Sequence, residues 1–514
     1  MKNKIMKDLM FIFQCMFVLA MVWIFILTIK RTALEIPMAF LLFIGFTAAI
    51  AIWMLKEKSF APMEGHKLFP IIWLISFVVM LILAFNLKVD MYNNWDYGKV
   101  LRSAYEWVTE GKITAFEYYI RYPNNQFLLL LLSIIIKIIL SVVPSADIYF
   151  CQDITIIINI LMIQLAIGLT HVIAGRMLDR KSLLLSDLFV AGCSPLYLYA
   201  SMLYTDTAAL LPLMLLIYCL IAGEEKLQKN QMKHAVLYFF VGGMIAAVGY
   251  YVKLTIIFFC IGFLIYVFLK WPWKRWLICV LCMAAGFLIA YTGTKKMITL
   301  QSDYTAEQYD TYQFPYVHWV MMSLGPNGRY NQDDVDYTLS FNSMDAKKQA
   351  DMKVIQERVS DMGLTGLLEH GLYEKVYHAW TQGALSADDY VHRQPLSTGI
   401  IRQIFALDGK YYKGYLLYAQ AYWLLIISGM ILSAVRYFKN REMCQIHGIE
   451  ITIFGLFVFL LLWESNPRYL MHFLLMFCIV SAYGYGIIRK TKQGKQNKEN
   501  KTQKNCLIKW RRGK

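Results

Sequence analysis

Long apolar runs recur along almost the whole chain, and they restrict its possible folds more than any other feature. Each run is near 20 residues, which is enough for a helix to cross a hydrocarbon core of about 30 Å. Because lipid offers no hydrogen-bond partners, such segments must be helical. The composition agrees: the chain has 514 residues, of which 58% are hydrophobic and 17% are charged. The sequence therefore predicts an all-α polytopic membrane protein.

About twelve transmembrane helices are expected from these runs. They cover residues 10–29, 36–55, 68–87, 148–172, 183–200, 207–222, 235–252, 254–270, 276–294, 414–436, 447–463 and 469–488. The first run is too long for a signal-peptide core and lacks a small-residue cleavage site, so we expect it to be retained.

One further apolar run, residues 127–143, is expected to lie along or dip into the outer face instead of crossing. Leaving it out places the cationic connections on the same side as the C-terminus; these connections are 175–182, 224–234, 270–275 and 436–442. That side is then the cytoplasm, because Lys and Arg are enriched in cytoplasmic loops. We therefore predict a multi-pass protein of the cell membrane with both termini in the cytoplasm. The Lys30–Arg31 pair is a minor exception.

The spans and their connections divide the chain into five parts. These are two leading spans (1–67), a core of spans with a first outer loop at 88–147 (68–294), a large and partly helical extracytoplasmic domain (295–412), the C-terminal spans (413–488) and a basic cytoplasmic tail (489–514).

The tail carries eleven Lys or Arg and one acid, Glu499, and so holds most of the chain's net charge of +16. We interpret this charge as fixing orientation and attracting anionic membrane lipid. The tail has one aromatic residue, so nucleic acid is not expected as a partner. The ten cysteines mostly lie within spans, and this includes the one CxxC pair, Cys279 and Cys282, inside the span predicted at 276–294. This placement argues against a zinc site or a disulfide framework.

Connections as long as 295–412 usually carry function or form a small domain. Apolar residues at helical spacing predict a helix over 344–363 that stops at Gly363. The face that they share consists of Met352, Ile355, Val359 and Met362. The motif HWVMMSLGPNGRY places His318 near a span end, where we expect it to meet the acceptor side of a cavity. The alternatives are a passive cap and a packed His318.

Acidic residues stand at the outer ends of spans, where a charge near lipid is costly and suggests function. Asp96, in NNWDYGKVLRSA, begins a helical pattern, so a helix-capping role is the structural alternative. Asp90 lies six residues nearer the preceding span and competes with Asp96 for the same role. Asp206, in YTDT, lies in a short outer turn among hydroxyl and aromatic side chains.

Three more charged residues fall on the same predicted side. Glu464 and Arg468 lie in WESNPRYLMHF between the last two spans, where an i,i+4 structural pair is the alternative. Lys253 is a lone cation between two apolar spans, and snorkelling to the interface is its alternative. Because these positions share one side with the acids, we expect one polar cavity at the outer leaflet.

The order of these motifs resembles the glycosyltransferase C superfamily. The motifs are Asp96 in the first outer loop, YPNNQ at 122–126, YTD around Asp206, HWVMMSLGPNGRY and ESNPRYL. They are similar to those of bacterial relatives of protein O-mannosyltransferases and aminoarabinose transferases, in a Gram-positive branch. The resemblance covers residue 68 to the last span. Some relatives have two adjacent carboxylates in the first loop; this chain has no clear pair there, which leaves metal use open.

The resemblance implies a transferase that moves a sugar from polyprenyl phosphate to an extracytoplasmic acceptor, which is a cell-wall glycan, a lipid or a protein. Asp96 would take the proton from the acceptor hydroxyl. Lys253 and Arg468 would stabilise the leaving phosphate, with Arg121 as a further candidate. Asp206 would position donor or acceptor hydroxyls.

The other expected substrate-binding residues are Tyr122, Asn124, Glu464 and His318. A phosphate leaving group requires no cofactor, although a divalent cation between Asp96 and Asp206 stays open. Two other classes compete: a polysaccharide polymerase or ligase, and a lipid or solute transporter. A transporter of this kind tends to show internal repeats and matching broken spans, and the sequence shows no such symmetry.

The topology can be tested by labelling single cysteines at two positions in intact cells. We expect a membrane-impermeant thiol reagent to label Lys137→Cys, on the surface run, from outside. The same reagent should leave Lys181→Cys unlabelled until the cells are opened. Labelling of Lys181→Cys from outside would overturn the whole arrangement.

Overall fold

The computed structural model describes residues 2–56, 64–92, 95–302 and 304–488. Within these ranges the regular structure is helical, apart from one isolated β-bridge between Val89 and Pro395. This confirms the predicted all-α class. The basic tail predicted at 489–514 lies outside the described residues.

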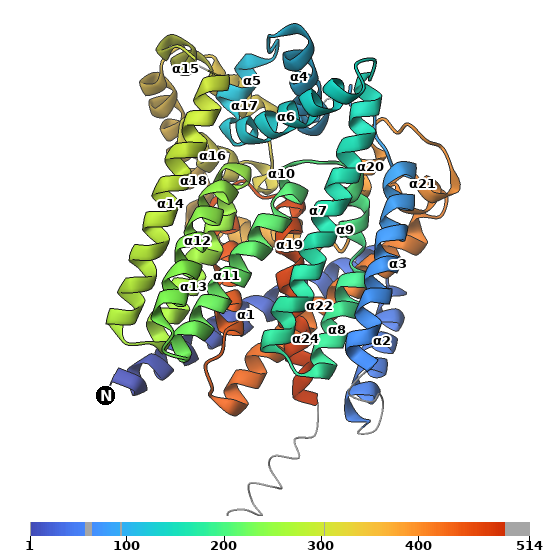
Figure 1. The fold of residues 1–514 in the computed structure, drawn as a ribbon, viewed down its shortest axis with the longest axis vertical. Helices are drawn as coiled ribbons and strands as arrows, with labels where there is room; N and C mark the ends of the chain where they lie inside the picture. The colour runs from blue at the N-terminus through green and yellow to red at the C-terminus, as the bar shows by residue number, and fades with distance from the viewer. Residues whose placement is uncertain (1, 57–63, 93–94, 303, 489–514) are drawn as a thin grey trace, which may run out of the picture.

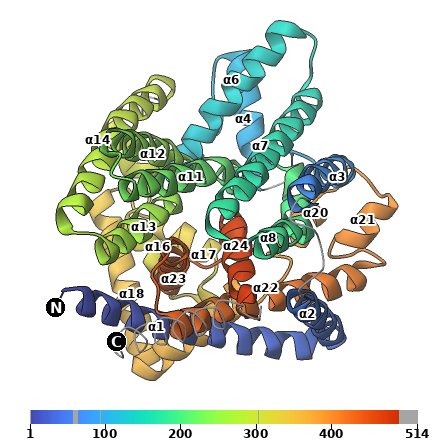
Figure 2. The same cartoon turned by 60° about the horizontal axis from the view of Figure 1, so that its bottom comes forward.

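Every predicted span corresponds to a helix or to a broken pair of helices in one bundle (Figure 1). The bundle contains α1 (Lys2–Glu35), α2 (Ala39–Leu55), α3 (Glu64–Asn86), α7 (Ile148–Met177), α8 (Arg180–Gly192), α11 (Leu210–Gln228), α12 (Met232–Val252), α13 (Ile257–Lys270), α14 (Trp273–Gln301), α22 (Tyr412–Asn440), α23 (Ile446–Leu462) and α24 (Leu474–Tyr485). Figure 2 shows α1 along one side of the bundle beside α22, with which it packs.

Nine of the described helices are long and apolar enough to cross a membrane, or ten if one bent pair counts as a span. One of the nine is the run with α6 (Gln126–Val142), which was predicted to lie on the surface. In Figure 1 α6 lies across the end of the bundle, beside α4 (Asp96–Glu110), and not along the bundle axis. Without it, eight long helices, the bent pair and three shorter apolar helices make the twelve expected spans.

The span predicted at 183–200 is broken instead of straight. After α8 the chain bends by 48°, and Pro195 stands at the start of α9 (Ser194–Leu198), where the helix begins anew. The short turn η2 (Tyr199–Ser201) follows. Asn159 on α7 donates hydrogen bonds of 3.0–3.2 Å to the carbonyls of Tyr199, Ala200 and Met202. This amide satisfies backbone groups that the break leaves free within the bundle.

The cationic connections meet at one end of the bundle. Arg176 pairs with Glu225 at 2.7 Å, joining the α7–α8 turn to the α11–α12 turn. Lys270 reaches buried Glu224 at 2.7 Å. These contacts explain why the connections share a side, as the charge pattern predicted.

The Lys30–Arg31 exception has a structural reason at the opposite end. Lys30 donates a 2.6 Å hydrogen bond to the Tyr373 hydroxyl, and Arg31 donates to Thr381 Oγ1 at 3.0 Å. Both acceptors belong to the large outer connection. The two cations therefore attach α1 to the outer domain.

The outer connection is ordered and mostly helical. Its helices are α15 (Ala306–Tyr312), α16 (Tyr316–Ser323), α17 (Gln332–Leu339), α18 (Met344–Glu369), α19 (Val376–Trp380), α20 (Ala387–His392) and α21 (Ile400–Phe405). Together with α4, α5 (Phe116–Arg121) and α6 they cover the end of the bundle that carries Lys30 and Arg31.

Helix α18 forms where predicted, but its buried face is different. Gly363 interrupts the helix with a φ of 57°, after which the helix resumes to Glu369. Met352 and Val359 are 42% and 37% exposed, whereas Lys347 and Asp351 are fully buried. Polar side chains of α18 are buried because the outer domain has a polar interior. Lys347 donates to three carbonyl oxygens of the 310–313 segment, and Asp351 accepts from Thr338 at 2.7 Å.

A buried lysine joins the outer domain to the bundle. Lys375, at the end of the π-helical turn η5 (His370–Lys375), donates to the carbonyl oxygens of Leu461 and Trp463 at 3.0 and 2.9 Å and contacts Ser323 Oγ. The Ser465 amide donates to the Gly328 carbonyl at 2.7 Å beside it. These contacts fix the outer end of α23, where the site residue Glu464 follows.

The Lys375 contact predicts a pH dependence of stability. Burial lowers the pKa of Lys375 from 10.5 to about 7. Between these values the unfolded chain binds more protons, so the free energy of unfolding rises as the pH rises above about 7. In detergent micelles we expect the Tm of the wild type to gain a few degrees over that of Lys375→Met between pH 7 and pH 9.5.

Lys353→Met is the matched control, because Lys353 is an exposed cation on α18. It should follow the wild type at every pH. A constant Tm difference between the wild type and Lys375→Met would show that Lys375 keeps its ordinary pKa.

Candidate functional site

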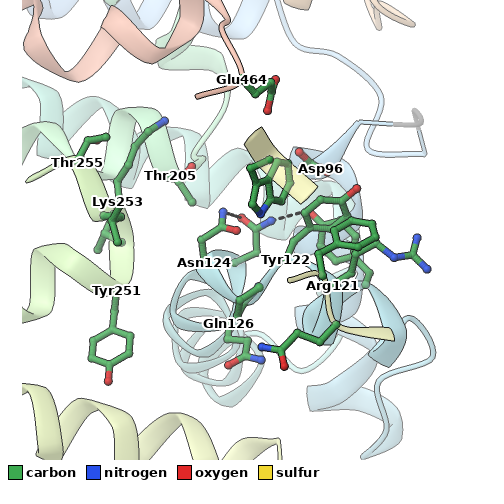
Figure 3. A pocket seen from close by; sticks show the side chains of 18 of the residues that line it. Asp96, Arg121, Tyr122, Asn124, Gln126, Thr205, Tyr251, Lys253, Thr255 and Glu464 are labelled. Carbon is green, nitrogen blue, oxygen red and sulfur yellow. Dashed lines mark hydrogen bonds between the residues drawn. The ribbon is translucent and has the colours of Figure 1, made fainter. Parts of the chain in front are cut away.

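A cavity of about 1380 Å³ lies between the first outer loop, the outer domain and the outer ends of α12, α14 and α23. Figure 3 shows Lys253 and Thr255 on one side of it, Asp96 and Arg121 on the other, and Asn124 and Tyr122 between them. Seven of the nine predicted site residues line this cavity: Asp96, Arg121, Tyr122, Asn124, Lys253, Glu464 and Arg468. The expectation of one shared polar cavity therefore agrees with the geometry.

Asp96 is the first residue of α4, and its Oδ2 accepts a 3.2 Å hydrogen bond from the Tyr204 hydroxyl. The preceding loop folds tightly onto this helix: a Cβ on Gly98 would lie 2.0 Å from the Met91 carbonyl oxygen. Only glycine allows this approach. The close contact fixes the start of α4 and hence the place of Asp96.

Asp90 is held differently. Its Oδ1 accepts from the Tyr92 amide at 3.0 Å, and its own amide donates to the Gln394 carbonyl at 2.8 Å. Asp90 does not line the cavity. Of the two competing acids, the geometry thus favours Asp96 as the one that can meet a substrate.

Asp206 lies in α10 (Thr205–Ala208) beneath the cavity wall and is only 1% exposed. Its carboxylate forms an ion pair with Lys253 and a second one with Arg468, whose Nε lies 3.2 Å from Oδ2. Lys253 and Arg468 line the cavity, whereas Asp206 does not. A buried carboxylate with two cations is satisfied only when all three are present. Asp206 therefore positions the cations and is not placed to touch a substrate.

Aromatic rings surround the guanidinium of Arg468. Its central carbon lies 5.0–6.0 Å from the ring centroids of Trp95, Tyr204, Tyr390 and Tyr469. Rings at this distance attract a cation and keep it in place. Neither Tyr204 nor Tyr390 is among the site residues expected from the sequence. Tyr204 stands beside Asp206 in YTD, but no sequence signal points to Tyr390 in the distant outer domain.

Arg468 retains hydrogen-bonding capacity. Its Nη1 is buried, and no acceptor for it exists among the described residues. Glu464 is also buried, and its Oε2 accepts a 2.9 Å hydrogen bond from the Tyr469 hydroxyl. Burial raises the pKa of Glu464. The i,i+4 pair of Glu464 and Arg468, which was the structural alternative for these residues, is not formed, because each has other partners.

The YPNNQ motif forms η1 (Pro123–Asn125) and the first residue of α6. Asn125 is buried and donates to the Tyr118 hydroxyl at 2.6 Å, while Gln126 donates to the Tyr119 carbonyl at 2.9 Å. These two amides brace the turn. Tyr122 and Asn124 line the cavity together with these two amides.

His318 does not reach the cavity. It is fully buried, its Nδ1 lies 2.8 Å from Thr338 Oγ1, and its ring stacks on Phe314 at 3.9 Å. Burial lowers the pKa of His318 to about 4. Its neighbours Trp319 and Tyr330 line the cavity instead. The geometry matches the packed alternative.

The carboxylates present do not fit a divalent cation between Asp96 and Asp206. The Asp206 carboxylate is already neutralised by two cations, and these occupy the side that faces the cavity. Among the described residues no three His, Cys, Asp or Glu side chains are grouped as metal ligands. Metal ligation there would require the Asp206 ion pairs to separate.

The residues that line the cavity come from two parts of the chain, and we call the two sides that they form its arms. The bundle helices α12, α14 and α23 form one arm, with Tyr250, Tyr251, Tyr291, Ile298, Leu456 and Phe459. The first outer loop and the outer domain form the other arm, with Thr114, Glu117, Arg121, Tyr309, Gln313 and Lys348. Asp96, Lys253 and Arg468 also line this one cavity, so both arms can supply a ligand to the same charged groups.

A family model described as "Conserved hypothetical integral membrane protein" matches residues 1–486. No curated protein matches the chain. Among solved structures, the oligosaccharyltransferase AglB from Archaeoglobus fulgidus, in complex with an inhibitory peptide and a dolichol-phosphate, is similar with a TM-score of 0.42 and 13% identity. A second structure of an oligosaccharyltransferase from that organism, tethered to an acceptor peptide, has a TM-score of 0.41 and 14% identity. The matches cover 80% of this chain, which spans about half the length of those proteins.

The ion pairs of Asp206 predict a stability difference between two similar substitutions. Asp206→Asn leaves two buried cations without a counter-charge, at a cost of about 3–5 kcal/mol. Asp96→Asn changes a cavity-lining residue that follows the N-cap residue Trp95 and forms no ion pair within the described chain. In detergent micelles we expect Asp206→Asn to lower the Tm by several degrees and Asp96→Asn to lower it little. Equal Tm values would contradict the positioning role of Asp206.

Proposed function

We propose that this chain, which belongs to the family of conserved hypothetical integral membrane proteins, is a membrane glycosyltransferase of the glycosyltransferase C type. It moves a sugar from a polyprenyl-phosphate donor to an extracytoplasmic acceptor. One observation carries the proposal. A carboxylate, Asp96, and two fixed cations, Lys253 and Arg468, line the same cavity, whose two arms lie in the bundle and beneath the outer domain.

The donor lies in the arm within the bundle. Tyrosine and aliphatic side chains there suit a polyprenyl chain near the headgroup region. The donor phosphate lies at Lys253 and Arg468, which Asp206 holds in position. The free Nη1 of Arg468 donates to a phosphate oxygen. As the phosphate leaves, these cations stabilise the charge that develops on it.

The acceptor lies in the outer arm, with its hydroxyl at Asp96. The hydroxyl oxygen attacks the anomeric carbon, and the bond from that carbon to the phosphate oxygen breaks with its electron pair going to the phosphate. Asp96 takes the hydroxyl proton as the new bond forms. Trp95, which packs against Tyr390 at 4.4 Å and lines the cavity, offers an aromatic surface for the sugar.

Tyr97, the other aromatic neighbour of Asp96, has a structural role. It is fully buried, and its hydroxyl accepts from Gln152 at 3.1 Å. Of the two aromatic neighbours of Asp96, Trp95 therefore lines the cavity and Tyr97 does not.

The test is turnover of polyprenyl-phosphate sugars by purified protein, measured as released polyprenyl phosphate. Asp96→Asn keeps size and polarity but cannot take the proton. We expect it to lose about a hundredfold or more of the turnover rate. Asp90→Asn, the matched control, should retain turnover because Asp90 does not line the cavity.

Each variant must insert normally and match the wild-type Tm before its rate is compared. If Asp90→Asn abolishes turnover while Asp96→Asn retains it, the base is Asp90. If the wild type releases polyprenyl phosphate from none of the donors in a panel of sugars, the proposed function itself fails.

A further inference from the structure

The cavity carries more positive charge than the donor phosphate needs. Its charged lining residues are the cations Lys99, Arg121, Lys253, Lys295, Lys348, Arg393 and Arg468 and the acids Asp96, Glu117 and Glu464. The cations outnumber the acids by more than two to one. Such a cavity attracts anions.

Four of these cations form ion pairs with acids. Lys253 and Arg468 pair with Asp206, Lys348 pairs with Asp345 at 3.6 Å on the rim, and Arg393 pairs with Asp389 at 2.6 Å. The other three, Lys295, Lys99 and Arg121, form no ion pair with an acid of the described chain. Lys295 is exposed to solvent, whereas Lys99 and Arg121 are partly buried.

Aromatic rings hold these two cations in place. The Lys99 ammonium lies 4.7 Å from the Tyr118 ring centroid, and the Arg121 guanidinium lies 5.8 Å from the Phe314 ring centroid. The Nε of Arg121 is buried, and no described residue accepts its hydrogen bond. The side chains of Lys99 and Arg121 are thus held in place, and their positive charges can bind a ligand.

The positive charges of Lys99 and Arg121 also repel each other. Burial lowers the pKa of Lys99, and the charges of Arg102 and Arg121 lower it further, while nearby Asp96 raises it. Arg102 is engaged elsewhere: it donates to the Met91 carbonyl at 2.5 Å and lies over the Tyr92 ring. A bound anion would relieve this repulsion by giving both cations a shared partner.

Arg121 and Lys253, one cation from each pair, lie on different sides of the cavity. In Figure 3 Arg121 and Lys253 lie on opposite sides of Tyr122. Lys99 follows Asp96 by three residues on α4, so its side chain lies one helical turn further on the same face. An anion at Lys99 therefore places a neighbouring hydroxyl of the same molecule beside Asp96.

We infer that the acceptor is an anionic molecule, whose phosphate or carboxylate group binds Lys99 and Arg121 while its hydroxyl meets Asp96. This inference rests on the proposed function and adds the chemical class of the acceptor. The donor phosphate uses Lys253 and Arg468, so the two substrates have separate anion sites within one cavity.

Binding of soluble oligomers to the donor-free protein tests the inference without turnover. The probes are a short poly(glycerol phosphate), an oligogalacturonate and a neutral malto-oligosaccharide of equal length. Trp95 and Trp319 line the cavity, so tryptophan fluorescence reports binding. We expect the wild type to bind at least one anionic oligomer about tenfold or more tightly than the neutral one, and increasingly less tightly as salt is added.

Arg121→Gln and Lys99→Gln should each remove most of this preference, and either variant suffices if the other fails to fold. Lys353→Gln, an exposed cation outside the cavity, is the matched control and should behave as the wild type. In the turnover assay, Arg121→Gln should raise the KM for the preferred anionic acceptor about tenfold. Its Kd for a polyprenyl-phosphate analogue should change less than twofold, whereas Arg468→Met should weaken that Kd.

Four outcomes would overturn the inference. The first is equal binding of neutral and anionic oligomers by the wild type. The second is a preference that both variants retain. The third is that Arg121→Gln weakens binding of a polyprenyl pyrophosphate and not of the oligomers, which would make Lys99 and Arg121 a site for a second donor phosphate. Donor turnover with neutral acceptors only would refute the anionic acceptor while leaving the proposed function intact.

Discussion

The buried ion cluster of Asp206, Lys253 and Arg468 joins three separate parts of the chain at the outer end of the bundle. Asp206 comes from α10, Lys253 from the turn between α12 and η3 (Leu254–Ile256), and Arg468 from η6 (Pro467–Phe473). A charge this close to lipid is tolerated only with partners. The cluster therefore fixes how these three segments pack against each other, and this packing forms the cavity wall.

Each of these three parts lies at the end of a span, where the backbone is a turn or a short helix. Irregular backbone at membrane depth is tolerated only where it lines a cavity or finds partners within the protein. Here Asn159 supplies partners around η2, and the Thr255 hydroxyl lies 2.8 Å from the buried ring of His472 across η3 and η6. At these ends polar side chains are buried within the protein instead of facing lipid. The cavity thus forms where the spans end in irregular segments.

The outer domain closes the cavity from the other side, and it has a polar interior. Arg358 and Asp334 pair at 2.6 Å, and Lys347 and Asp351 are buried with hydrogen-bond partners. Such a network is stable only when its members are satisfied together. Tyr390, which belongs to this domain, completes the rings around Arg468. The domain and the bundle therefore build one site in common, joined by Lys375.

The sequence by itself determined the helical class, the twelve segments and the placement of charges at one end, because the cost of exposing backbone or charge to lipid depends on local composition alone. It also identified Asp96, Lys253 and Arg468 as charged residues near lipid, where a charge is costly and indicates a function. Only the tertiary structure decided their partners. Whether Asp206 faces a substrate or two cations, whether His318 is packed, and whether Lys99 and Arg121 lack a counter-charge depend on contacts between residues far apart in the chain. The polar face of α18 was missed for the same reason, since its partners lie on other helices.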